Sequence, residues 1–154
     1  MKTYLYVFFI SMVPVIELRG AIPFGCATGL PWYTNFLLCI VGNLLPVPFI
    51  LFLIEWALGI MKKIKYVDRF AYWLEEKAEK NKEKITKYAT FGLLLFVGIP
   101  LPGTGAWTGS LVASMLEVPP KKAFPPIAVG VVGAAMIVTV LYYFFHDLFV
   151  MFVG

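Results

Sequence analysis

The chain has 154 residues, enough for one domain, and 60% of them are hydrophobic, which gives a mean hydropathy of +0.84. The net charge of +4 comes from one segment, because Lys62 to Lys87 holds nine of the thirteen basic and five of the nine acidic residues. This pattern excludes an ordinary soluble domain and argues against a nucleic-acid-binding face, and it predicts a single integral membrane domain over residues 1–154.

The first apolar segment, Tyr4 to Val13, covers only about half of a ~30 Å hydrocarbon core. The stretch PVIELRGAIPFG, from Pro14 to Gly25, is expected to break it, and a second short arm runs to Leu30. Backbone that leaves a helix at membrane depth is tolerated only where protein or a water-filled cavity covers it. Two half-length arms around a polar break therefore predict a re-entrant hairpin.

The segment from Asn35 to Ile60 is long enough to cross the membrane, with kinks expected at Pro46 and Pro48. Lysines follow it at once, which marks a cytoplasmic end by the positive-inside rule. From there to residue 88, apolar residues recur at helical spacing with Lys and Glu on the other face. We expect residues 61–88 to form an amphipathic helix on the cytoplasmic surface.

The second half repeats this order. Phe91 to Ile99 is too short to span, the stretch GIPLPGTGAWTGS breaks it, and Leu111 to Leu116 forms another short arm. After EVPPKK, the segment from Ala123 to Phe145 is the second predicted crossing.

The two halves, residues 1–60 and 89–154, can be aligned. Gly20-Ala21 falls on Gly105-Ala106 at an offset of 85, and Pro31, Phe36, Val41 and Gly42 fall on Pro119, Phe124, Val129 and Gly130 at an offset of 88. One hairpin plus one crossing in each half makes the halves antiparallel, an inverted repeat with both termini outside. Inverted repeats with broken helices near the midplane are typical of secondary transporters.

Two charges lie in the first break, Glu17 and Arg19. A charge at membrane depth is costly and marks function by default. Burial would favour the protonated form of Glu17, so that it could take up and release a proton, and the planar fork of Arg19 could bind an anionic headgroup. The alternative is a structural pair that pins the hairpin.

The second break has no charge but offers hydroxyls, an indole and glycine-rich backbone, which can form an anion-binding nest. The alternative is that its glycines only let two tips pack closely. Asn43 could cap a broken helix, and Glu55 could carry a proton. The candidate binding residues are Glu17, Arg19, Gly20, Pro23, Asn43, Glu55, Pro102, Gly103, Thr104, Gly105, Trp107 and Thr108. Cys26 and Cys39 match no metal spacing, and we expect no metal, no cofactor and no enzymatic activity.

At ELRGAIP and PLPGTGAWTG the chain resembles the small multidrug export protein family, and the resemblance covers essentially the whole chain. That family is similar to the DedA/VTT superfamily, whose members have two facing re-entrant hairpins and are associated with moving lipids, including polyprenyl phosphates, with proton coupling. The resemblance implies functional charges at Glu17 and Arg19 and a second tip built on Pro102, Gly103, Thr104, Gly105 and Trp107. Better-known members carry arginines in the second hairpin region, where this chain has none between Lys87 and Lys121.

These observations lead to a transporter of the prokaryotic plasma membrane that passes an amphiphile, such as a phospholipid or polyprenyl phosphate, between two hairpin tips. A homodimer is expected, because one protomer could hardly shield both hairpins from lipid. Two alternatives stay open: efflux of cationic hydrophobic compounds with Glu17 as the counter-charge, and a membrane scaffold that transports nothing.

Overall fold

The computed structural model describes residues 2–61, 82–101 and 103–153. Residues 62–81, the main part of the predicted amphipathic helix, lie outside this description. The described residues fold into helices, as predicted. In chain order these are α1 (Lys2–Met12), α2 (Glu17–Ala27), α3 (Trp32–Leu44), α4 (Pro46–Met61), α6 (Lys82–Gly98), α7 (Ala106–Met115) and α8 (Pro120–Val153).

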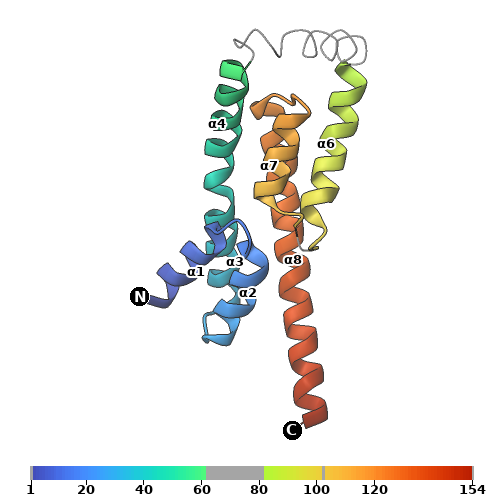
Figure 1. Cartoon of the computed structure of the whole chain (residues 1–154). Coiled ribbons are helices and arrows are strands. Elements are labelled where there is room, and N and C mark those ends of the chain that lie inside the picture. Colours follow the sequence, from blue (N-terminus) through green and yellow to red (C-terminus); the bar gives the residue numbers. More distant parts are fainter. Residues whose placement is uncertain (1, 62–81, 102, 154) are drawn as a thin grey trace.

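Two apolar segments are long enough to cross a membrane, Trp32–Ala57 in α3 and α4 and Pro120–Asp147 in α8. Both of the predicted crossings are confirmed in this sense, and each begins three residues earlier than expected. The kink predicted in the first crossing is a break at Leu45 between α3 and α4, where prolines 46 and 48 cannot donate helical hydrogen bonds. The two segments run in opposite directions (Figure 1).

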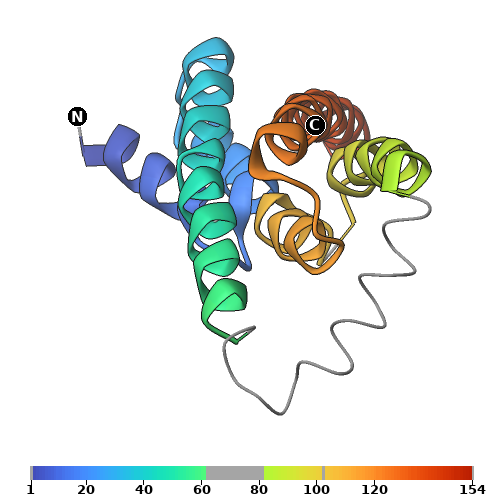
Figure 2. The same cartoon turned by 90° about the horizontal axis from the view of Figure 1, so that it is seen from above.

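The remaining helices pair into two hairpins, α1 with α2 and α6 with α7. The turn from α2 into α3 lies at one end of the bundle and the turn from α7 into α8 at the other, so the hairpins point toward each other (Figure 1). Seen along the bundle, α1 to α4 gather on one side and α6 to α8 on the other (Figure 2).

The breaks within the hairpins are shorter than the sequence suggested. Helix α2 already begins at Glu17, so Gly20, Pro23 and Gly25 lie inside it rather than in the break. A single proline removes only one donor from a helix, and the tertiary packing of α2 retains the helix in spite of it. In the second half the break spans residues 99–105, and α7 begins at Ala106.

The core of the bundle combines branched aliphatic side chains with many small ones. Alanines 21, 106, 113, 123, 134 and 135 are fully buried, whereas Phe49, Trp56, Phe144 and Phe145 on the two long segments are exposed. Buried alanines let helices approach closely, and large aromatic side chains on the outside suit contact with lipid. Together with the two apolar segments, this distribution indicates a membrane protein.

The turns that lead out of α2 and α7 are built alike. The N–H groups of Thr28, Gly29 and Leu30 donate to the carbonyls of residues 24, 26 and 25, and those of Leu116, Glu117 and Val118 donate to residues 112, 114 and 113. Every one of these pairs is shifted by 88 residues. The central residue is left-handed in both turns, with φ 79° at Gly29 and 54° at Glu117.

Gly42 and Gly130, which are also 88 residues apart, have the same role in packing. A Cβ on Gly42 would overlap Ser11 and the Phe8 carbonyl of α1, and a Cβ on Gly130 would lie 2.9 Å from Val97 and 3.0 Å from the Leu94 carbonyl of α6. Each long segment therefore approaches the first arm of its own hairpin through a missing side chain.

Replacing Gly29 by alanine is expected to destabilise the protein by about 1 kcal/mol, because a Cβ is strained at this positive φ. A Cβ here would meet nothing within 4 Å, so the change isolates the backbone effect. Gly133→Ala is the matched control: it is equally uncrowded but lies inside α8, where alanine should stabilise slightly. Thermal unfolding in detergent measures both, and equal shifts for the two variants would contradict the assignment.

Candidate functional site

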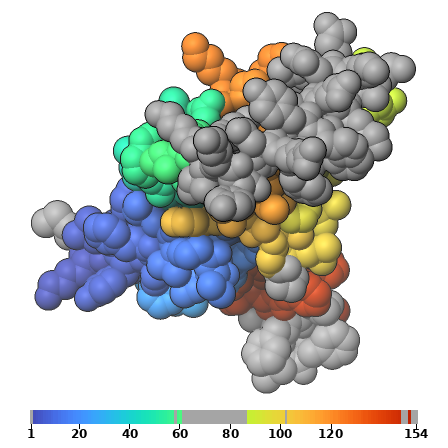
Figure 3. Space-filling model, turned by 45° about the horizontal axis from the view of Figure 1, so that its top comes forward, coloured from blue at the N-terminus to red at the C-terminus, as the bar shows by residue number. Residues whose placement is uncertain are grey.

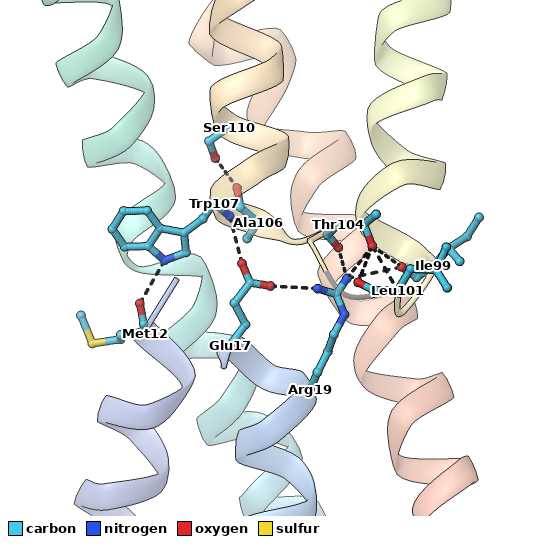
Figure 4. A network of polar contacts seen from close by, with 9 residues as sticks. All are labelled: Met12, Glu17, Arg19, Ile99, Leu101, Thr104, Ala106, Trp107 and Ser110. Carbon is cyan, nitrogen blue, oxygen red and sulfur yellow. Dashed lines mark hydrogen bonds and ion pairs between the residues drawn. The ribbon is translucent and has the colours of Figure 1, made fainter. Parts of the chain in front are cut away.

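The two hairpin tips meet in the middle of the bundle. Residues near 100–110 lie directly against the residues of the first hairpin in the space-filling view (Figure 3). A network of polar contacts joins them, with Glu17 and Arg19 on one side and Thr104 and Trp107 on the other (Figure 4).

Glu17 is the first residue of α2 and its carboxylate lies at the beginning of α7. It is 3% exposed, and its Oε1 accepts a hydrogen bond from the Trp107 backbone N–H at 3.3 Å. A carboxylate at this place caps the free N–H groups of α7 and complements its dipole. The N-cap residue of α7, Gly105, has no side chain of its own, and a Cβ there would overlap the Glu17 carboxylate. Gly105 is therefore required by the close approach of Glu17.

Arg19 lies two residues further along α2 and reaches across to the second break. Its Nη1 lies 3.2 Å from Glu17 Oε2, and its Nη2 donates to the Thr104 carbonyl and lies 3.0 Å from the Thr104 hydroxyl and 3.3 Å from the Ile99 carbonyl. The planar guanidinium thus connects the Glu17 carboxylate to the carbonyl oxygens of Ile99 and Thr104, which follow the end of α6 and are not part of a helix.

Thr104 and Trp107 hold the second tip in shape. The Thr104 hydroxyl lies 2.8 Å from the Ile99 carbonyl and 2.9 Å from the Leu101 carbonyl, which closes the loop between α6 and α7. The Trp107 indole N–H donates to the Met12 carbonyl at the end of α1, at 3.0 Å. Each tip therefore satisfies backbone groups that the other leaves open.

The arrangement suits reversible binding of a charged group. Glu17 and Arg19 neutralise each other, but the buried Arg19 Nε has no hydrogen-bond partner among the described residues. The guanidinium N–H groups of Arg19 now donate to uncharged oxygens and to one carboxylate. An oxyanion that approached Arg19 could accept hydrogen bonds from the same N–H groups. Charge-assisted bonds to a phosphate would be stronger than those to the carbonyls.

The structure brings five of the predicted site residues together: Glu17, Arg19, Thr104, Gly105 and Trp107. Pro102 lies outside the described residues. Gly103 forms the exposed turn of the second break with φ 83°. Gly20 and Pro23 lie within α2, and Thr108 lies within α7; none of these three residues joins the network. Glu55 lies apart from it, on the C-terminal half of α4, exposed and facing the turn between α7 and α8.

Asn43 lies on α3, one residue before its end. It is 1% exposed, and neither its amide nitrogen nor its oxygen has a hydrogen-bond partner within the described residues. Asn35, two turns earlier, is also buried but donates to the Ile22 carbonyl at 2.8 Å. The sequence singled out Asn43 and missed Asn35, although any amide in so apolar a segment is a signal of a buried contact.

Several participants act through their backbone and have no sequence signal of their own. The carbonyls of Met12, Ile99 and Leu101 accept hydrogen bonds only because the helices end there. Ser110 and Ser114 were also not predicted as site residues. Both are buried and bond back to the α7 backbone, at 2.6 and 2.9 Å. No cluster of metal-binding side chains occurs within the described residues.

A family model described as "Putative small multi-drug export protein" matches residues 17–137. The match begins at Glu17, the first residue of α2, and includes the second break, the first long segment and most of the second. The chain belongs to this family. The search of curated proteins found no match, and neither did the search of solved structures.

Membership in an export family agrees with the apolar segments and makes a membrane transporter or exporter the coarse function. The family match does not include α1, yet the Met12 carbonyl at the end of α1 receives the Trp107 indole. The site therefore extends beyond the matched residues.

Asn43→Leu is expected to raise the thermal stability of the purified protein, by about 1–3 kcal/mol, because it removes two buried polar atoms without partners and keeps the branched shape. The matched control is Asn35→Leu, which breaks the bond to the Ile22 carbonyl and should lower stability. Unfolding curves in one detergent compare the two. A loss of stability in Asn43→Leu as large as in the control would show that the Asn43 amide is satisfied.

Proposed function

We propose that the chain is a membrane transporter that passes an amphiphile with an anionic headgroup, such as a phospholipid or polyprenyl phosphate, between its two hairpin tips. The observation that carries this proposal is the contact of Arg19 with Glu17 and with Thr104 of the opposite tip. The relation to the DedA/VTT superfamily that the resemblance implied would place lipids among its substrates.

The depth of the tips supports this reading. Helices α2 and α7 have 11 and 10 residues, about 16 and 15 Å at 1.5 Å per residue, or half of a ~30 Å core. If each hairpin enters from its own surface, the tips meet near the midplane. Trp32 and Tyr33 at the start of α3, and Tyr142 and Tyr143 in α8, would then form the aromatic belt of one interface.

We infer that the two halves form an inverted repeat. The turns and glycines related by 88 residues support it, and so does the network itself. Arg19 and Thr104 are 85 residues apart, the offset at which the sequence aligns the two breaks, so they would be equivalent positions that touch across the repeat axis. Both termini would lie outside and residues 61–88 in the cytoplasm.

In the proposed mechanism the substrate headgroup competes with Glu17 for Arg19. Proton uptake by Glu17 removes its charge, which weakens both the ion pair and the cap on α7. Arg19 is then free to bind the phosphate while the tips separate. Release of the proton restores the ion pair and expels the headgroup, so that passage of the amphiphile is coupled to a proton.

Efflux of cationic hydrophobic compounds is the second candidate, and the family description favours it. In that case the buried Glu17 carboxylate would be the counter-charge for the compound. The adjacent Arg19 already neutralises this carboxylate, so a cation would have to displace a guanidinium held by three further oxygens. This physical cost makes an anionic headgroup the better match.

We also propose a homodimer. Phe9 of α1 and Phe91 of α6 are exposed on the outer sides of the two hairpins, where lipid would reach short helices whose ends are polar. A second copy would cover such a face and keep the ends of the short arms away from hydrocarbon.

Glu17→Gln is expected to abolish the effect of a pH gradient on transport and to slow transport about tenfold or more, because it removes the titrating charge and leaves Arg19 without its ion-pair partner. The assay follows labelled polyprenyl phosphate, labelled phospholipid and a cationic dye in proteoliposomes, with and without the gradient. Transport of the dye alone would favour drug efflux over the lipid reading.

Asp147→Asn is the matched control, since it neutralises an exposed carboxylate at the far end of α8. It should transport as the unmodified protein does. A Glu17→Gln protein that responds to the gradient as strongly as this control would refute proton coupling at Glu17. If none of the three compounds moves with the unmodified protein, the scaffold alternative gains.

Single cysteines test the orientation, in a chain whose Cys26 and Cys39 are replaced by alanine. Thr28→Cys lies in the turn after α2 and should react with an impermeant maleimide on intact cells. Met115→Cys, exposed at the end of α7, should react only after the cells are permeabilised. Labelling of both from the same side would contradict the antiparallel halves.

A further inference from the structure

A groove separate from the hairpin tips runs between α4 and the beginning of α8. Its polar part is a pocket of about 330 Å³ that Glu55 of α4, Ser114 of α7 and Glu117 line from opposite sides. At Leu51 and Pro120 it joins a second pocket of about 340 Å³. The wall of that second pocket is formed mainly by Pro48, Phe52, Phe124 and Pro125, with Lys121 at its edge.

The two parts of the groove differ in their depth along the helices. The carboxylates of the polar part lie toward the end of α4 and just before α8, whereas Lys121 lines the second pocket. The phenylalanines lie about one turn closer to the middle of both helices. In the membrane orientation proposed above, the groove is polar toward the membrane surface and apolar toward the membrane interior, which is the orientation of a lipid in a leaflet.

We propose that this groove holds a phospholipid with a primary ammonium headgroup. Its ammonium would lie beside the Glu55 carboxylate, its phosphate beside Lys121, and one acyl chain along Phe52 and Phe124. Glu55 forms no ion pair within the described residues, so a cation can bind it without displacing a partner there. The ammonium, phosphate and acyl chain of such a lipid follow one another in the same order as the carboxylate, lysine and apolar wall of the groove.

Other amphiphiles match only part of the groove. An anionic lipid without an amine would place no positive charge beside the Glu55 carboxylate. A choline lipid brings the charge but has no N–H to donate to this carboxylate, whereas a primary ammonium has three. A simple alkylamine would satisfy Glu55 and the apolar wall but leave Lys121 without a phosphate.

Photo-crosslinking can identify the occupant in a bilayer. A benzophenone-bearing phenylalanine replaces Phe52 in the groove, and in a matched control it replaces Phe49, which lies on the same helix, is 69% exposed and does not line the groove. Each protein is reconstituted in vesicles of equal parts phosphatidylethanolamine, phosphatidylglycerol and phosphatidylcholine. After illumination, mass spectrometry identifies the attached lipids.

At position 52 the ethanolamine lipid should exceed its share of the bilayer about two- to fivefold, the effect expected of a partly exposed ion pair. At position 49 the attached lipids should follow the bulk composition. Glu55→Gln should reduce the enrichment at position 52 to the bulk value, and Glu55→Asp, which keeps the charge, should retain most of it.

Attached lipids at position 52 that mirror the bulk, or that are enriched in the glycerol or choline lipid, would overturn the proposal. So would an enrichment that survives in Glu55→Gln. Dodecylamine added to the vesicles should compete only weakly, and full displacement by it would assign the groove to amines rather than to phospholipids. Each variant is compared at equal monodispersity in size-exclusion chromatography, so a misfolded protein is recognised before the lipids are counted.

Discussion

Buried backbone at the end of a helix must find hydrogen-bond partners, and in this protein each hairpin supplies partners for the other. The free N–H end of α7 meets the Glu17 carboxylate, the carbonyls at the end of α6 meet Arg19, and the carbonyl at the end of α1 meets the Trp107 indole. The fold depends on this exchange, because contacts within each hairpin, such as those of the Thr104 hydroxyl, leave these groups without partners of their own.

The exchange is unequal in chemistry although the halves are alike in architecture. The first tip carries both charges, and the second contributes a hydroxyl, an indole and backbone groups. A turn that uses glycine in the first half carries Glu117 in the second, at a left-handed φ that costs a non-glycine residue roughly 1–2 kcal/mol. Both differences place titratable groups at positions where the hydrogen bonds of the turn or tip do not require them.

The sequence predicted the parts of the fold that follow from hydropathy and from the positions of proline and glycine. These are two long apolar segments, the short arms and two polar breaks. It also predicted that Glu17 and Arg19 lie together with Thr104, Gly105 and Trp107. It could not predict where the breaks end, because packing keeps Pro23 inside α2. Nor could it identify backbone acceptors such as the Ile99 carbonyl. Every residue has a carbonyl, and this one is an acceptor for Arg19 only because the helix ends there.

The long separation between the partners has a consequence for the biosynthesis of the protein. Thr104 follows Arg19 by 85 residues, which a ribosome adds in roughly 4 to 17 s. During that interval the Arg19 guanidinium and the Met12 carbonyl lack the partners that the second tip supplies in the folded protein. The order of synthesis therefore leaves the first hairpin incomplete until the second has been made.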